Sequence, residues 1–157
     1  MVDLDKVLEL VRAMNDEEVA YVTFGALALG VHALPRSTED VDFFIAPTVE
    51  NIERLKRALR RVWTDPCIDE ISAEDLLGEY PSVRYGPPDE DFTIDFLTHL
   101  GEAYHYDTLD WEVGELDGTP IRVVTPRMLY SMKKDTVRPK DRIDAEMLRR
   151  KFGFGDK

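Results

Sequence analysis

YVTFGALALGVHALPRSTEDVDFFI, residues 21–45, is the stretch around which the rest of the chain is organised. It runs from an apolar segment into Gly25, then through a short helical segment and a polar turn into a second apolar segment. Residues i and i+2 of a strand point to the same face, so Asp40 and Asp42 should project side by side. Two carboxylates this close repel each other unless a cation lies between them. The pair therefore predicts half of a magnesium site.

The composition is typical of a globular protein. With 157 residues, of which 33% are charged, we expect residues 1–157 to form a single domain. No run of residues is long and apolar enough to span a membrane, and the acidic N-terminus does not resemble a signal peptide. The lone Cys67 can form no internal disulfide, and we expect it to be buried or half-buried. These features predict a cytoplasmic protein with no membrane partner.

The net charge of −12 is unevenly distributed along the chain. Residues 64–125 hold 16 acidic and 2 basic side chains, whereas residues 126–157 hold 10 basic and 5 acidic ones. A protein that binds extended DNA needs a broad basic face, which only the C-terminal segment could offer. We therefore expect no extended DNA binding, while an RNA end or a triphosphate held by the basic segment stays open.

Hydrophobic periodicity and turn residues predict the secondary structure. Helices are expected over about 4–14, 25–33, 49–63, 73–78, 126–134 and 140–152. Strands are expected over 20–24, 40–45, 82–85, 91–97, 111–116 and 120–124. The third and fourth of these strands would form one hairpin, and the last two a second one across a type I′ turn at Asp117 and Gly118.

A third carboxylate, Asp95, lies in a strand whose other residues look like core. Phe92, Ile94 and Phe96 alternate there with more polar positions. Burying a lone ionised aspartate is costly, so Asp95 needs a cationic partner, a metal ion or exposure at a cleft. We take it as the third carboxylate of the metal site.

Two sets of residues resemble a known family. The first looks like the glycine-to-DxD signature of nucleotidyltransferases with the polymerase-β-like fold: Gly25, Ala26, Ala28, His32, Arg36, Thr38, Asp40 and Asp42. Together with Asp95, a second set is similar to the narrower group of AbiEii-like nucleotidyltransferases: Lys133, Lys134, Arg138, Pro139, Lys140, Asp141 and Asp144. One departure is Ala26, where the superfamily usually has glycine or serine, so a phosphate-binding hydroxyl is missing.

The resemblance implies both a fold and a reaction. The fold would be of the α/β (α+β) class, with a mixed, mostly antiparallel sheet, flanking helices on one side of it, and C-terminal helices that close a cleft. The reaction would be the magnesium-dependent transfer of a nucleoside monophosphate from an NTP, either ATP or GTP, to an acceptor hydroxyl. Two magnesium ions would take part in the active complex.

The resemblance also implies a role for each candidate residue. Asp40 and Asp42 would hold the metal that carries the triphosphate, and Asp95 would join them at the second metal and help to deprotonate the acceptor. The nucleotide would be bound by Gly25, Ala26, Arg36, Thr38, Lys133 and Lys134.

Structural roles stay open for several of these residues. Arg36 could pair with an acidic neighbour, Thr38 could organise the turn, and the two lysines could form a solvated helix end. Arg138, Lys140, Asp141 and Asp144 could equally form a salt-bridge network.

The acceptor also stays open. One hypothesis is an AbiEii-like enzyme that modifies a tRNA end, a protein or itself, with a toxin role and an antitoxin partner. The acidic residues 64–125 suit a cationic amino sugar instead, as in small-molecule transferases that modify lincosamides or aminoglycosides. A third hypothesis is an inactive nucleotide-binding or antitoxin-like module.

Overall fold

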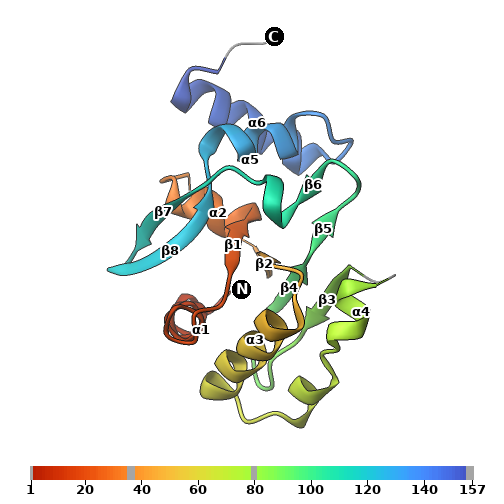
Figure 1. Cartoon of the computed structure of the whole chain (residues 1–157). Helices are drawn as coiled ribbons and strands as arrows, with labels where there is room; N and C mark the ends of the chain where they lie inside the picture. The colour runs from red at the N-terminus through yellow and green to blue at the C-terminus, as the bar shows by residue number, and fades with distance from the viewer. Residues whose placement is uncertain (1, 35–37, 79–80, 155–157) are drawn as a thin grey trace.

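The computed structural model describes residues 2–34, 38–78 and 81–154, and six of the strands form one mixed sheet in the order β3-β4-β2-β1-β8-β7 (Figure 1). The strands are β1 (Tyr21–Phe24), β2 (Asp40–Ile45), β3 (Ser82–Tyr85), β4 (Thr93–Leu97), β7 (Trp111–Leu116) and β8 (Thr119–Val124), while β5 (His99–Leu100) and β6 (Tyr104–His105) form a separate pair. The helices are α1 (Leu4–Asp16), α2 (Gly25–Val31), α3 (Val49–Val62), α4 (Ala73–Leu77), α5 (Pro126–Lys134) and α6 (Pro139–Phe152), with short 3-10 helices at η1 (Pro66–Glu70) and η2 (Tyr106–Thr108).

Two central strands, β1 and β2, join the halves of the sheet. They pair antiparallel with each other, while β2 runs parallel to β4 and β1 runs parallel to β8. The hairpins β3–β4 and β7–β8 complete the two edges with antiparallel pairs. The predicted mixed, mostly antiparallel sheet and both predicted hairpins are thereby confirmed.

Local signals explain why these elements form where the sequence predicts them, to within about two residues. Asp117 and Gly118 have φ values of 49° and 78°, as a type I′ turn requires. The Thr125 hydroxyl caps α5 by accepting a hydrogen bond of 3.2 Å from the amide of Met128. The short β5, β6, η1 and η2 were not predicted from the sequence.

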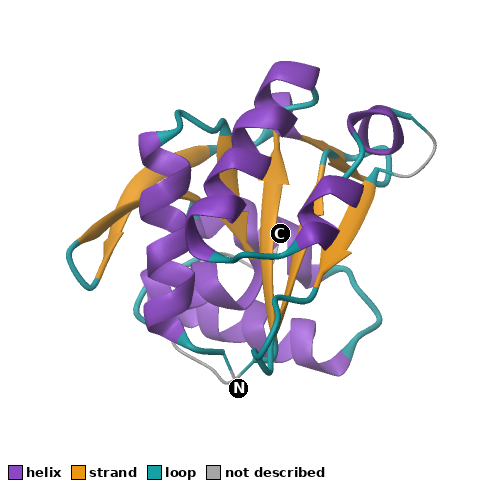
Figure 2. Cartoon of the chain, turned by 90° about the horizontal axis from the view of Figure 1, so that it is seen from below, coloured by secondary structure: helices purple, strands orange, loops and turns teal. Residues whose placement is uncertain are grey.

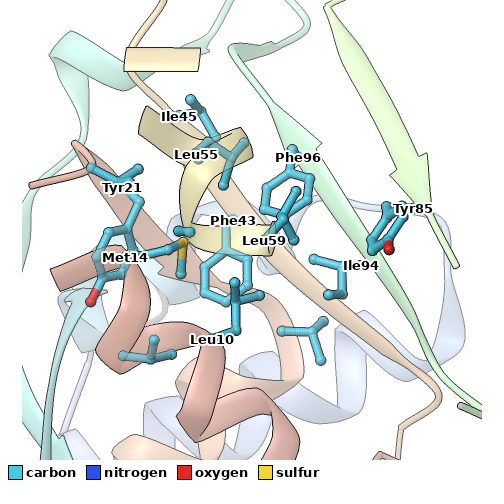
Figure 3. Close-up of a cluster of buried hydrophobic side chains, with 14 of the residues drawn as sticks. Leu10, Met14, Tyr21, Phe43, Ile45, Leu55, Leu59, Tyr85, Ile94 and Phe96 are labelled. Carbon is cyan, nitrogen blue, oxygen red and sulfur yellow. The ribbon is translucent and has the colours of Figure 1, made fainter. Parts of the chain in front are cut away.

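Helices cover both faces of the sheet, which corrects the expectation of helices on one side (Figure 2). On one face, Phe43 and Phe96 pack in a core cluster with α1 and α3 (Figure 3). On the other face, Phe44 packs with Leu129 of α5 and Leu148 of α6. The neighbours Phe43 and Phe44 point to opposite faces of β2 and are both 0% exposed, so each face needs a covering layer.

The face that carries the aspartates is the one under α2, α5 and α6. Asp40 and Asp42 share their side of β2 with Phe44, because all three occupy alternate positions. The two C-terminal helices therefore lie across the strand ends that carry the carboxylates, as the predicted closed cleft requires (Figure 1).

Two expectations from composition concern the surface. None of the helices in the described ranges is long and apolar enough to cross a membrane. Cys67 is exposed, and not buried or half-buried as expected, because η1 turns its neighbour Ile68 into the core instead.

Candidate active site

A cleft of about 1130 Å³ separates the aspartate face of the sheet from the C-terminal helices. One wall consists of residues from β2, β3, β4 and the start of α2, and the other of residues from α5, α6 and the loop between them. The predicted site residues that line it are Gly25, Ala26, Thr38, Asp40, Asp42, Asp95 and Lys133. Most of the residues that the sequence singled out are thus brought together in one place.

The register of three adjacent strands sets the geometry of the carboxylates. Asp42 on β2 lies directly opposite Asp95 on β4, and Asp95 lies opposite Arg84 on β3. On one face of the sheet these strands therefore present a row of Arg84, Asp95 and Asp42. Asp40 lies two residues from Asp42 on the same face, opposite Thr93. All three predicted carboxylates consequently meet at one end of the cleft.

The carboxyl group of Asp42 is strongly perturbed. Burial, together with the charges of Asp95 and Asp40 and a hydrogen bond with Asp95, raises its pKa to about 7, against an opposing effect of the nearby Lys133. Three carboxylates this close cannot all ionise cheaply without a cation. This perturbation marks Asp42 as the residue that would gain most from a bound cation.

Each of the other two carboxylates is held by a neighbour that the sequence analysis did not single out. The Thr93 hydroxyl donates a hydrogen bond of 2.6 Å to Oδ1 of Asp40. Arg84 donates two hydrogen bonds to Asp95, from Nε to Oδ1 at 2.9 Å and from Nη2 to Oδ2 at 3.2 Å. The Thr38 hydroxyl donates a hydrogen bond to the backbone carbonyl of Asp40 and accepts one from its amide, both 3.1 Å long. Thr38 therefore organises the turn, which is one of the two roles expected for it.

Gly25 is fixed both by its backbone conformation and by its contact with Asp42. Its φ is +73°, a value that residues with a Cβ rarely adopt. A Cβ at this position would lie 2.3 Å from Oδ2 of Asp42. The glycine therefore allows the start of α2 to come into direct contact with the carboxylate, and the adjacent Ala26 is 7% exposed.

The basic residues predicted to bind the nucleotide differ in their positions. Lys133 is buried at the cleft, with Nζ 3.2 Å from Oδ1 of Asp141 and 2.9 Å from Oδ2 of Asp144. Arg138 also approaches Asp141, with Nε 3.8 Å from Oδ2, so three of the four residues expected to form a salt-bridge network do so. The central cation of this network is Lys133, which was not expected in it and which also lines the cleft. Lys134 is exposed, packs over the Tyr130 ring, and is not among the described residues that line the cleft. Arg36 lies outside the described residues.

Comparison with known proteins identifies the family. Residues 25–156 match the family model described as nucleotidyl transferase AbiEii toxin, type IV TA system. The chain belongs to this family. It is therefore a nucleotidyltransferase with the fold that the resemblance implied. No curated protein sequence matches the chain.

Solved structures share the fold of this AbiEii nucleotidyltransferase. One is ANT(2″)-Ia in complex with adenylyl-2″-tobramycin, 13% identical, with a TM-score of 0.61 over 98% of this chain and 91% of that one. A second is a Thermotoga maritima protein assigned as a nucleotidyltransferase, 15% identical, with a TM-score of 0.56 over 98% of this chain and 96% of that one. At such low identity the likeness concerns the fold alone.

The chemistry of the donor set fits a magnesium site in this nucleotidyltransferase. Asp40, Asp42 and Asp95 offer the carboxylate oxygens that magnesium prefers, and their mutual repulsion is relieved by a cation. As the side chains stand, no three His, Cys, Asp or Glu residues within the described ranges are arranged to hold a metal. Asp95 directs both of its oxygens to Arg84.

Gly25→Ala is expected to impair both stability and transfer. The added Cβ would displace the Asp42 carboxylate, and the positive φ would add strain of about 1–3 kcal/mol. Urea denaturation and a nucleotide-transfer assay would measure the two effects. Gly30→Ala is the matched control in α2, because a Cβ at Gly30 meets nothing within 4 Å. Equal behaviour of the two variants would contradict the proposed contact.

The raised pKa of Asp42 predicts how stability depends on pH in the absence of divalent metal. Between pH 4 and 7 the folded protein keeps a proton on Asp42 that the unfolded chain releases. This contribution to stability is complete below pH 4 and is lost as pH rises through about 7, at a cost of about 2–4 kcal/mol. Urea denaturation in EDTA from pH 4.5 to 8.5 should show the loss in the wild type, and Asp42→Asn should remove it. Parallel pH profiles for the two proteins would contradict this assignment.

Proposed function

We propose that this enzyme transfers a nucleoside monophosphate from an NTP, ATP or GTP, to an acceptor hydroxyl in a magnesium-dependent reaction. The observation that carries the proposal is the position of Asp42, crowded by Asp40 and Asp95 and facing a wall that carries Lys133. Carboxylates on one wall suit metal ions, and cations on the other suit the phosphates of the same substrate. These features support a role for the cleft in binding a triphosphate with its metal.

The residues of the cleft supply positioning and charge. Asp40 and Asp42 would hold the metal that accompanies the triphosphate, and Asp95 would complete the second metal site on the acceptor side. Bound magnesium would polarise the phosphoryl oxygens and favour ionisation of the acceptor hydroxyl. Asp95 would help to take the proton from that hydroxyl. Catalysis of this kind depends mainly on holding the reacting oxygens in line and compensating charge.

The nucleotide-binding roles follow from the same geometry. We propose that the backbone at Gly25 and Ala26 holds the terminal phosphates, because no side chain separates that backbone from Asp42. Lys133 is held in a fixed position by Asp141 and Asp144, which suits a point charge directed at the triphosphate. Roles in nucleotide binding for Arg36, Thr38 and Lys134 remain predictions.

We favour an RNA end or a protein as the acceptor over an amino sugar. The argument for a cationic acceptor was the acidic segment 64–125, yet Asp95 is the sole carboxylate from its described residues that lines the cleft. The same segment contributes Arg84 beside it, and the facing wall adds Arg138 and Lys140. A polycationic amino sugar would meet these positive charges as well as the carboxylates of the cleft, whereas the phosphates of an RNA end would be attracted by the cations. For a protein acceptor, which carries no phosphate, the cations are no argument in either direction.

Transfer of a label from each α-labelled NTP, with magnesium, would test the proposal. The acceptors would be total RNA, total protein, the enzyme itself and a panel of aminoglycosides and lincosamides. Label in RNA or protein is expected, and label in an amino sugar would favour the small-molecule alternative. Tight NTP binding without transfer to any acceptor would contradict the catalytic proposal and favour an inactive module.

We extend the proposal to the cellular role and organisation of the chain. The family description names a toxin of a type IV toxin–antitoxin system, so we propose a toxin role and an antitoxin partner. An NTP substrate and the exposed thiol of Cys67 both suit a reducing cytoplasm. The continuous sheet, which takes strands from both halves of the sequence, supports a single domain over residues 1–157.

A further inference from the structure

Arg84 forms an ion pair with Asp95, the third carboxylate of the proposed metal site. Its Nε and Nη2 contact both oxygens of Asp95, at 2.9 and 3.2 Å. The strand register places Arg84 on one side of Asp95 and Asp42 on the other. Asp95 therefore lies between a fixed cation and the position where a metal would have to bind.

The two cations would compete for one negative charge. The bidentate pair offsets part of the negative charge of Asp95 and engages both of its oxygens, so a metal that uses Asp95 must share or replace the guanidinium. Arg84 extends from the edge strand β3 and its side chain is 65% exposed, against 19% for Asp95. A cation this exposed can return to water at little cost, because ion pairs at the surface contribute little net stability.

We propose that Arg84 is a positioning residue that competes with divalent metal for Asp95 and so weakens metal binding until substrate is present. This inference rests on the proposed function, and it concerns metal loading, not the transfer step. Once displaced, the guanidinium would be solvated at the edge of the cleft and available to the phosphates of a bound nucleotide. Arg84 would thereby favour loading of metal together with nucleotide over loading of metal alone.

Binding of Mn²⁺ alone to the full chain, followed by calorimetry and by the EPR signal of free Mn²⁺, tests the proposal. Arg84→Gln is expected to bind Mn²⁺ about tenfold more tightly than the wild type, the effect of removing one partly screened positive charge near the metal. Arg138→Gln is the matched control, since Arg138 also lines the cleft and is 73% exposed but pairs with Asp141. Its affinity for Mn²⁺ should change by less than about twofold.

A double-mutant cycle separates competition from a general effect of charge. In an Asp95→Asn background, Arg84→Gln should no longer change Mn²⁺ affinity, because the two cations have no shared carboxylate. Arg84→Lys keeps the positive charge but loses the bidentate geometry of the guanidinium, so its affinity for Mn²⁺ should lie between those of the wild type and Arg84→Gln. Circular dichroism would establish that each variant is folded.

The possible outcomes all decide the question. Weaker Mn²⁺ binding by Arg84→Gln would mean that Arg84 orients Asp95 for the metal, and unchanged binding would mean a surface pair; either result overturns the proposal. If Arg84→Gln binds Mn²⁺ and the wild type does not, the result supports the proposal. If neither protein binds Mn²⁺, the proposal is overturned. Failure of Asp42→Asn to reduce transfer would instead contradict the proposed function, so the two failures are distinguishable.

Discussion

Asp42→Asn is expected to lower nucleotidyl transfer by at least about 100- to 1,000-fold, the loss typical for one positioned electrostatic group. Asparagine keeps the size of the side chain but removes its negative charge, so the proposed metal loses a ligand while the packing of β2 remains. At pH 8 without metal, the same variant should unfold at a higher urea concentration than the wild type. The ionised Asp42 is costly there because burial and two neighbouring carboxylates disfavour its charge.

Opposite changes in activity and stability would mark Asp42 as functional. The measurements are transfer of label from an NTP with magnesium and urea denaturation in EDTA, both at pH 8. Glu39→Gln provides the matched control, because Glu39 also lines the cleft but its side chain is exposed. It should change both quantities little. Retained transfer in Asp42→Asn, or a loss of stability at pH 8, would show that Asp42 does not have the assigned role.

The parts of the site that could be predicted from the sequence depend on local signals. The alternation of β2 places Asp40 and Asp42 on one face whatever surrounds them. Gly25 stands where a strand turns directly into a helix, and its φ of +73° explains why a glycine is needed. Asp95 required one further step, since a carboxylate in an apolar strand indicates a partner but does not name it.

The parts that could not be predicted depend on contacts between distant segments. Arg84 reaches Asp95 and Thr93 reaches Asp40 only because β3, β4 and β2 pair in one register. Nothing in the local sequence around Arg84 distinguishes it from a solvated strand residue. That helices cover both faces of the sheet could not be predicted for a related reason. The order of the strands in the sheet decides which helices pack on each face of β2.

The burial of Lys133 on α5 also depends on contacts that the local sequence does not show. The sequence pattern of two lysines at a helix end indicates two solvated side chains, yet Lys133 is 7% exposed, whereas Lys134 is exposed as expected. The packing of α6 on α5 brings Asp141 and Asp144 to its ammonium group, with Asp144 0% exposed. One helical position thus decides which lysine is structural.

Lys133→Met is therefore expected to lower the free energy of unfolding by about 3–5 kcal/mol at pH 7, because it removes one partner of a buried ion pair. The buried Asp144 would lose the ammonium that is 2.9 Å away in the wild type. Lys134→Met is the control, one residue along the same helix, and its cost should stay within about 0.5 kcal/mol, as for other surface substitutions. Urea denaturation of both variants would measure the difference.

Charge can be separated from packing by a second substitution. Adding Asp144→Asn to Lys133→Met should recover part of the lost stability, since the amide needs no compensating cation. The cost of Lys133→Met should also shrink as pH falls and Asp141 takes up a proton. Burial raises the pKa of Asp141, but Lys133, with smaller contributions from Thr136 and Arg138, lowers it below its usual value. Equal costs for Lys133→Met and Lys134→Met would show that the buried network contributes no stability. A role for Lys133 would then have to come from the nucleotide alone, and transfer measured well below the unfolding midpoint would reveal it.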